Sequence, residues 1–161
     1  MAINGSLCEQ FVHRFKAAGR TFGTAESLTA GLIAASVANV PGSSAVLMGG
    51  IVSYAERVKA ELLQVDQEIL DTVGVYSPEC AQQMAEGAWE ALDVDIAVSV
   101  TGIAGPDGGT PEKPVGTVFI GTCNVDETRV AECHFTGDRQ SIREQTVEMA
   151  LKLALEMLES M

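Results

Sequence analysis

The spacing of apolar residues predicts helices along most of the chain. Residues 6–18 carry apolar side chains every three or four positions and are followed by Gly19, which is typical of a helix that ends at a glycine. Pro41 limits a second helical segment, and Ser77-Pro78 is a strong signal for the start of a later one. The predicted helices cover residues 6–18, 28–38, 56–63, 66–73, 78–92 and about 138 to nearly 161.

Apolar runs of strand length lie between these helices. Two of them flank Asp126-Glu127, which predicts a β-hairpin at that point. The predicted strands cover residues 21–25, 45–54, 95–101, 115–125 and 128–135. Strands and helices alternate before the hairpin and a terminal helix, so the sequence predicts an α/β fold: a three-layer α/β/α sandwich with a mixed, mainly parallel sheet. The length indicates a single domain over residues 1–161.

The apolar positions of two predicted helices indicate how these helices pack. The helix over 78–92 should turn one face inward, formed by Cys80, Met84, Gly87, Ala88 and Ala91. The terminal helix has apolar residues on more than one face. Either a second subunit or the chain's own domain could cover the additional face, and the sequence does not choose between them.

The charge of the chain limits its possible partners. The 161 residues carry a formal net charge of −12, which argues against nucleic acid because such binding depends on many Lys and Arg contacts. No apolar run approaches the roughly 18 residues that span a bilayer, and residues 1–11 lack the features of a signal peptide. We therefore expect a cytoplasmic protein with neither a nucleic-acid nor a membrane partner.

Cysteine and histidine are not spaced for metal binding. No CxxC pair occurs, and the adjacent Cys133 and His134 should point to opposite faces of a strand. We expect no metal ion, and reduced thiols that are mostly buried. The residues concerned are Cys8, Cys80, Cys123, Cys133, His13 and His134.

Candidate chemistry gathers where the first three strands end. If these strands run parallel, Ser27, Tyr54 and Thr101 meet at one edge of the sheet, where ligands bind in open α/β folds. Half of the sixteen residues in 101–116 are Gly or Pro. Successive N–H groups of such a loop can hold a phosphate or an oxyanion, although a tight connection explains the composition equally well. Its glycines include Gly102, Gly105, Gly108 and Gly109.

Ser27 has two interpretations. It could cap the next helix, as could Thr29, or it could act as a nucleophile with Lys59 as its base. Lys59 lies one turn into the helix after Tyr54 and projects back toward the strand end, where burial would lower its pKa. An exposed lysine is the more common outcome for this residue type.

Arg139 and Arg143 lie four residues apart at the start of the terminal helix. A guanidinium fork at a helix N-terminus suits a phosphate group. Pairing with nearby surface carboxylates explains the same residues. The segment from Ala60 to Glu112 contains no Lys or Arg, so several of the few cations lie near the candidate site, which favours a small anionic ligand without excluding surface scatter.

Several segments together resemble the CinA C-terminal domain family. They are AESLTAG (25–31), VPGSSAV (40–46), GGIVSYAERVKAELL (49–63), GVYSPECAQQMAEGA (74–88), VTGIAGPDGGTPEKPVGTVFI (100–120) and FTGDRQSIR (135–143). The resemblance covers nearly the whole chain and implies the three-layer fold and a stand-alone nicotinamide mononucleotide deamidase. It implies hydrolysis of the carboxamide to nicotinate mononucleotide and ammonia in NAD salvage, no cofactor, and a homodimer.

The resemblance also implies roles for individual residues. Ser27 would be the nucleophile, Lys59 its base and Tyr54 a proton-relay or orienting group. Ser44 and Thr101 would line the amide and oxyanion region. Arg139 would hold the phosphate. Arg143, four residues later, is a second candidate for the same role.

This chain departs from the family pattern at a few positions. The first motif usually reads AESCTGG, where this chain has Leu28 and Ala30, and Ser-Asn usually follows the tyrosine, where this chain has Ala55-Glu56. A methyl group beside the nucleophile and a carboxylate beside a phosphate substrate could change rate or preference. Two alternatives therefore stay open: a nucleotide-sensing or adaptor domain without catalysis, and an amidohydrolase for another small amide.

Overall fold

The computed structural model describes residues 3–161, so residues 1 and 2 of the predicted domain lie outside the described residues. Within this range one sheet has the strand order β2-β1-β3-β4-β5. Its strands are β1 (Phe22–Glu26), β2 (Leu47–Val52), β3 (Ile96–Gly102), β4 (Thr117–Cys123) and β5 (Thr128–His134). β1 pairs in parallel with β2 and β3, whereas β4 runs antiparallel to both of its neighbours. Only β4 is reversed among these strands, which confirms the mixed, mainly parallel sheet.

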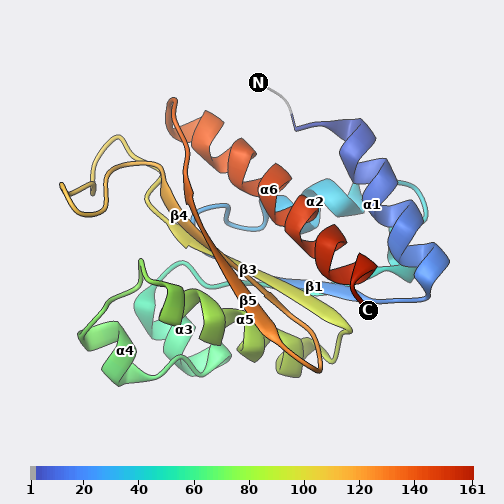
Figure 1. Cartoon of the computed structure of the whole chain (residues 1–161), viewed down its shortest axis with the longest axis horizontal. Coiled ribbons are helices and arrows are strands. Elements are labelled where there is room, and N and C mark those ends of the chain that lie inside the picture. The colour runs from blue at the N-terminus through green and yellow to red at the C-terminus, as the bar shows by residue number, and fades with distance from the viewer. Residues whose placement is uncertain (1–2) are drawn as a thin grey trace.

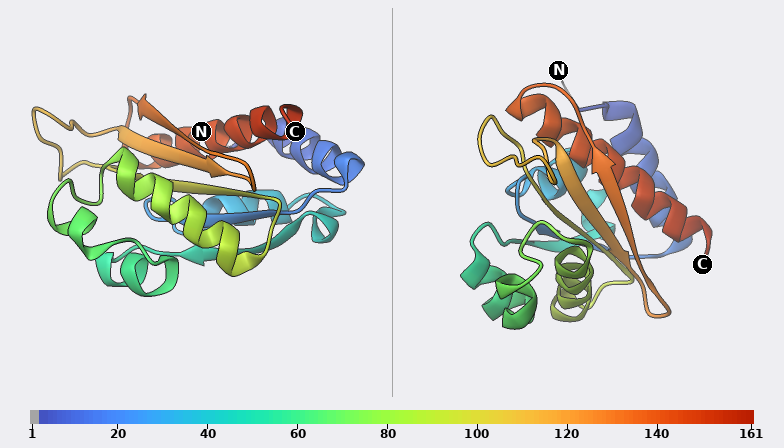
Figure 2. Two further views of the ribbon diagram at one scale, coloured as in Figure 1. Left: turned by 60° about the horizontal axis from the view of Figure 1, so that its bottom comes forward. Right: turned by 60° about the vertical axis from the view of Figure 1, so that its left-hand side comes forward.

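Helices cover both faces of the sheet, which confirms the three-layer prediction (Figures 1 and 2). α1, α2 and α6 lie on one face, and α3, α4 and α5 on the other. The helices are α1 (Gly5–Ala18), α2 (Leu32–Ala38), α3 (Glu56–Leu63), α4 (Gln67–Asp71), α5 (Pro78–Leu92) and α6 (Arg139–Glu159), with a short 3₁₀ helix η1 (Ser43–Ala45) before β2.

The first face of the sheet is packed by aromatic and branched side chains. Phe11 and Phe15 stack with ring centroids 4.4 Å apart, and both meet the edge or face of Phe22 on β1. All three rings are fully buried. Since burial of one such side chain stabilises a fold by about 1.5–3 kcal/mol, this cluster strongly stabilises the packing of α1 on the sheet.

α5 packs on the opposite face. Its predicted cap is present, because Ser77 Oγ accepts a hydrogen bond from Cys80 N at 3.2 Å. The inward stripe runs through Ala81, Met84 and Ala88, all fully buried. The prediction that Ala91 faces inward is wrong: with 3.6 residues per turn, the stripe continues at Leu92, and Ala91 is exposed.

α6 is covered by its own chain. Asp138 caps it by accepting a hydrogen bond from Ser141 N at 2.8 Å. Most of its apolar positions from Ile142 to Leu158 are buried against α1, α2, β3 and β4. The chain's own domain therefore covers most of its broad apolar surface, and Met149 and Leu153 are partly buried.

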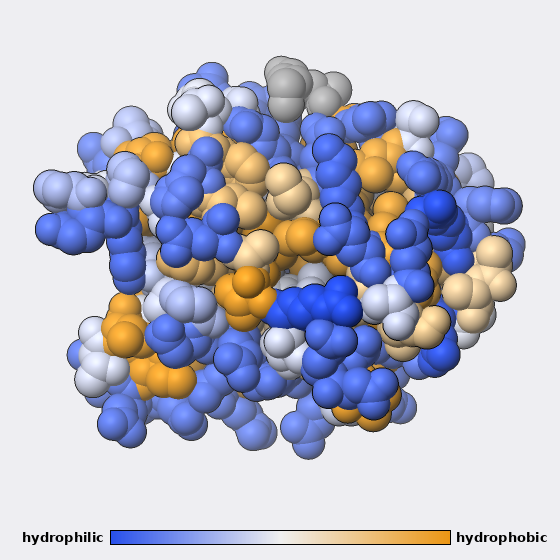
Figure 3. All heavy atoms as spheres, in the orientation of Figure 1, coloured by the Kyte–Doolittle hydropathy of each residue, from blue (hydrophilic) through white to orange (hydrophobic). Residues whose placement is uncertain are grey.

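The surface is mainly hydrophilic, with smaller hydrophobic groups between the polar residues on the face shown in Figure 3. In the part of the chain that the structure describes, no helix is both long and apolar enough to cross a membrane. The cysteines are free thiols, and burial raises the pKa of Cys80 to about 11. Residues 3–161 contain no group of three His, Cys, Asp or Glu side chains that could hold a metal ion.

Candidate active site

Ser27 lies in a turn that connects β1 to α2, and it does not cap the helix. α2 begins only at Leu32, because Ala30 and Gly31 have left-handed φ values of 49° and 97° that interrupt a helix starting at Leu28. The prediction of a helix from residue 28 with Ser27 or Thr29 as its cap is therefore wrong. The hydroxyl of Ser27 is left available for another contact.

Glu26 supplies the capping interaction instead. Its carboxylate accepts hydrogen bonds from Ile33 N at 2.8 Å and from Ala34 N at 3.0 Å. It also accepts from the hydroxyls of Thr29 and Thr24, at 2.6 Å and 3.0 Å, and it is fully buried. A carboxylate at a helix N-terminus satisfies the free N–H groups there and is stabilised by the helix dipole.

Lys59 and Ser27 meet below the surface. Lys59 Nζ lies 3.0 Å from Ser27 Oγ, and only 2% of the lysine is exposed. The same nitrogen lies 2.8 Å from the carbonyl oxygen of Ser53 and 3.0 Å from that of Tyr54. α3 projects the side chain back toward the end of β2, which is the direction that long helical side chains favour.

Burial lowers the pKa of Lys59 below its ordinary value, and charge interactions, first with Cys80 and then with the carboxylate of Glu56, partly oppose this effect. The neutral amine has two N–H donors and one lone pair. In this form the two backbone carbonyls, which can only accept, can take both donors and leave the lone pair for Ser27 Oγ; in the ammonium form all three groups accept hydrogen bonds from Lys59 Nζ. The geometry is that of a serine whose proton can pass to a lysine.

A pocket of about 330 Å³ opens above this pair. Its walls come from the β1–α2 turn, the start of α3, the segment before α5, the β3–β4 loop and the start of α6. The predicted site residues that line it are Ser27, Tyr54, Lys59, Gly102, Gly105 and Arg139. Parallel β1, β2 and β3 thus deliver side chains to one edge, as the topology requires.

Tyr54 takes a different place from the one expected of a proton relay. Its hydroxyl accepts a hydrogen bond from Arg139 Nη2 at 3.1 Å, and its side chain is largely exposed. Arg139 also donates from Nη1 to the carbonyl of Gly105 at 2.8 Å. Tyr54 therefore contacts Lys59 through its backbone carbonyl, and its phenol lies with Arg139 at the rim.

Thr101 and Arg143 are the predicted site residues whose side chains the structure directs elsewhere. Thr101 Oγ1 is fully buried and donates to the carbonyl of Val75 at 2.8 Å, so it holds a wall of the pocket without lining it. Arg143 donates to the carbonyls of Leu28 and Thr29, at 2.8 Å and 3.1 Å. Neither side chain therefore lines the Ser27–Lys59 pocket, and Arg143 lines a separate hollow beside Arg139.

Ser44, Gly108 and Gly109 also lie away from the pocket. Ser44 is exposed in η1, which precedes β2, whereas Tyr54 follows β2. The two residues therefore lie at opposite ends of this strand. Gly108 and Gly109 are exposed in the outer part of the β3–β4 loop. This part folds back on itself through a hydrogen bond from Thr110 N to the carbonyl of Lys113 at 2.9 Å.

The pocket also contains residues that the sequence interpretation missed. Tyr76 and Asp107 line it, and Glu56, noted only as a departure from the family, lines it as well. Asp107 lies within the glycine-rich stretch that was singled out, and Tyr76 lies in the segment 74–88 that carries the resemblance, where no role was assigned to it. Among residues 3–161, the backbone N–H groups of Ala104 and Gly105 find no acceptor, and both residues line the pocket.

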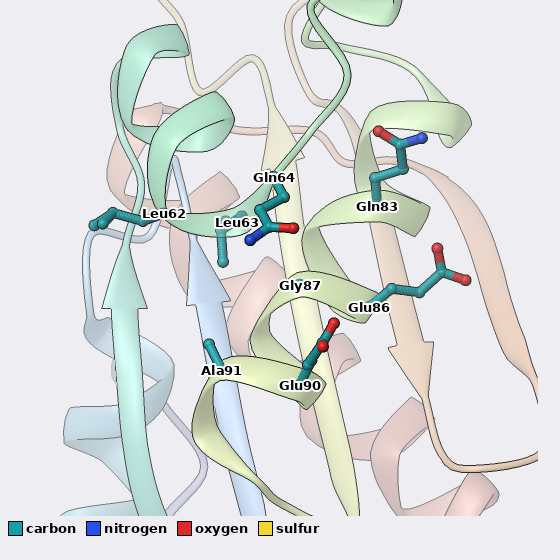
Figure 4. A pocket seen from close by; sticks show the side chains of 8 residues that line it. All are labelled: Leu62, Leu63, Gln64, Gln83, Glu86, Gly87, Glu90 and Ala91. Carbon is teal, nitrogen blue, oxygen red and sulfur yellow. The ribbon is translucent and has the colours of Figure 1, made fainter.

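A second pocket of similar size lies between the end of α3 and α5 (Figure 4). The side chains of Gln64, Gln83, Glu86 and Glu90 surround it, together with Leu62 and other apolar groups. No nucleophile with an adjacent base is present in its lining, so it does not compete with the Ser27–Lys59 pocket as a site for chemistry.

The fold and the pocket together define an α/β protein with a buried serine–lysine pair at the carboxyl edge of its sheet. The chain belongs to the CinA C-terminal domain family, whose model matches residues 4–158.

Individual relatives agree with this assignment. A CinA-like protein from Syntrophotalea carbinolica is 46% identical over 134 residues, which are 83% of this chain and 32% of the relative, so the chain spans about a third of that protein's length. The solved structure of the competence/damage inducible protein CihA from Agrobacterium tumefaciens is 39% identical with a TM-score of 0.92, covering 96% of this chain and 94% of that one. A CinA superfamily protein from Klebsiella pneumoniae has 30% identity, a TM-score of 0.94 and 98% coverage of both chains.

Proposed function

We propose that this chain is an amidohydrolase that converts nicotinamide mononucleotide into nicotinate mononucleotide and ammonia. The observation that carries the proposal is the buried 3.0 Å contact between Lys59 Nζ and Ser27 Oγ, in which two backbone carbonyls hold the lysine nitrogen in place. Burial lowers the pKa of Lys59, which increases the share of the neutral amine that can take a proton at a given pH.

In the proposed reaction, Lys59 Nζ takes the proton of Ser27 while Ser27 Oγ bonds to the carboxamide carbon. Within residues 3–161, the N–H groups of Leu28, Ala104 and Gly105 have no acceptor and belong to residues that line the pocket, so they are the proposed donors to the oxyanion that forms. Collapse of the tetrahedral intermediate breaks the C–N bond, and the lysine returns its proton to the departing ammonia. Water, activated by the same lysine, then cleaves the acyl ester and restores the serine.

Arg139 is the proposed phosphate ligand. It lines the pocket, and its two contacts with Gly105 and Tyr54 leave other guanidinium N–H groups available. Tyr54 and Tyr76 both line the pocket and offer ring faces of the size of a pyridine ring.

The test is incubation of the purified protein with nicotinamide mononucleotide in metal-free buffer, with ammonia and nicotinate mononucleotide both measured. Ser27→Ala and Lys59→Met should each lower kcat by about 10³-fold or more, because either change removes the nucleophile–base pair. Ser6→Ala, at an exposed serine of α1, is the matched control and should keep full activity. Release of ammonia by Ser27→Ala at the wild-type rate would contradict the nucleophile assignment.

A second candidate follows from the names of the relatives, which describe competence/damage inducible proteins. A nucleotide-sensing domain would bind the mononucleotide in the same pocket and release no ammonia. Calorimetric titration of the wild type, run beside the activity assay, separates this function from the first.

A further inference from the structure

The turn that carries Ser27 is held from outside by a side chain distant in sequence. Arg143, on the first turns of α6, donates from Nε to the carbonyl of Leu28 at 2.8 Å and from Nη2 to that of Thr29 at 3.1 Å. The rigid guanidinium fork therefore binds two successive carbonyls of the turn. Arg143 forms no ion pair with any carboxylate among residues 3–161, so these carbonyl dipoles are its principal partners.

This turn needs external support because its backbone is strained. Ala30 has φ 49°, and in this left-handed region the Cβ of an L-residue lies too close to the following carbonyl oxygen. Such conformations persist where the surroundings over-determine them, and they occur at functional sites. A glycine at this position would adopt the same φ without this steric penalty.

Glu26 and Arg143 restrain the turn from its two ends. Glu26 binds the hydroxyl of Thr29 and the first free N–H groups of α2. Arg143 binds the carbonyls that Glu26 cannot bind, because a carboxylate has no donor. The trans peptide places the N–H of Thr29 opposite the Leu28 carbonyl, so the contact with Arg143 also fixes the direction of this amide.

We propose that Arg143 is a positioning residue that holds the Ser27 turn in its reactive geometry, and not a ligand of the substrate phosphate. This inference rests on the proposed function for its kinetic test. Arg143 does not line the pocket, whereas Arg139, one helical turn earlier, does. The spacing of the two arginines in the sequence does not distinguish their roles. In the structure Arg139 lines the pocket, and Arg143 binds the turn that carries Ser27.

The test compares Arg143→Ala and Arg143→Lys with Arg139→Ala. Both Arg143 variants should lower kcat by about 10²-fold with KM changed less than about twofold, because a small displacement of the nucleophile costs rate and not binding. Arg139→Ala should mainly raise KM. Guanidinium chloride at non-denaturing concentration should partly restore kcat to Arg143→Ala and not to Ser27→Ala. A raised KM with unchanged kcat in the Arg143 variants would overturn the proposal and make Arg143 a substrate ligand.

A second readout does not depend on the identity of the substrate. A fluorophosphonate probe should label Ser27 in the wild type, and the labelling rate should fall in both Arg143 variants while their thermal melting shows a folded state. Arg143→Lys keeps the charge and most of the length, so it guards against a loss of folding in Arg143→Ala. Unchanged labelling would overturn the positioning role. Lower labelling together with no deamidation by the wild type would retain this role and reject the proposed substrate.

Discussion

Ala30 shows how a single methyl group can affect a site at the residue scale. Its φ of 49° places the Cβ in a region that L-residues rarely adopt, directly between the nucleophile and α2. The chain tolerates this strain because Arg143 and Glu26 bind the neighbouring residues. The strained residue is therefore a direct target for substitution.

Ala30→Gly should raise the free energy of unfolding by up to about 1 kcal/mol, since glycine adopts the left-handed region without penalty and loses part of this gain to backbone entropy. Urea denaturation followed by circular dichroism measures the change. The control is Ala35→Gly, at an exposed position inside α2, where the same substitution should lower the free energy of unfolding by about 0.5–1 kcal/mol. Equal effects at the two positions would contradict the strain at Ala30.

Glu56 should tune the pH dependence of the reaction. Lys59 acts as a base only when neutral, so kcat should rise with pH through the pKa of Lys59, which burial lowers and Glu56 partly raises. Glu56→Gln removes the opposing charge, lowers this pKa further, and should move the acid limb of the pH–rate profile to lower pH. Glu61→Gln, also on α3 but paired with Arg57 at the surface, should leave the limb in place. A shift to higher pH in Glu56→Gln would contradict the assignment of the limb to Lys59.

Individual site residues were predictable to different degrees. The Ser27–Lys59 pair could be expected because strand ends converge and a helical lysine projects toward the N-terminus of its helix. The acceptors of Thr101 and Arg143 could not be expected. They are backbone carbonyls of segments distant in sequence, and no local pattern shows which carbonyl lies nearest to a hydroxyl or guanidinium group.

At the scale of elements, the contact between α3 and α5 determines where Lys59 lies. A Cβ at Gly87 of α5 would overlap the carbonyl oxygen of Leu63, at the end of α3. The absence of a side chain at Gly87 therefore sets the separation of the two helices. Because α3 also carries Lys59, this separation affects the position of the base relative to Ser27.

Gly87→Ala should lower the free energy of unfolding by about 1–3 kcal/mol, because the overlap with a backbone carbonyl exceeds the gain in helix propensity. It should also lower kcat, since α3 must shift. Gly5→Ala in α1, where a new Cβ meets no atom within 4 Å, is the control and should be neutral or stabilising. Thermal unfolding and kcat measured on the same preparations would reveal the two effects together. Full stability of Gly87→Ala would show that α3 moves freely.

The elements themselves followed closely from apolar spacing, and the differences concern their ends. β2 begins at Leu47 and not at Ala45, because η1 occupies Ser43–Ala45. α2 begins four residues later than predicted. In both cases a short turn with positive φ, at Gly42 or at Ala30-Gly31, separates the elements, and a left-handed alanine has no signature in the sequence.

For the whole molecule, the order of layers could be predicted because alternating strands and helices allow few arrangements. The sequence could not predict which surface covers α6, because a helix with a broad apolar surface fits both an intrachain and an intersubunit position. The structure assigns this surface to the chain's own α1, α2, β3 and β4. The expectation of a homodimer stays a prediction.

The reversal of β4 determines the path that the β3–β4 loop has to take. Because β3 and β4 are antiparallel neighbours, the loop over residues 103–116 leaves and re-enters the sheet at the same edge, beside the pocket, and extends from the body of the molecule in Figure 1. A crossover between parallel strands would have to be long enough to traverse the sheet. The β3–β4 loop does not have to cross the sheet. Its outer residues can therefore be substituted without changing the path of the chain. The loop thus has two parts: its inner residues Ala104, Gly105 and Asp107 line the pocket, and its outer residues 108–112 lie outside the pocket, where substitutions could alter access without changing the sheet.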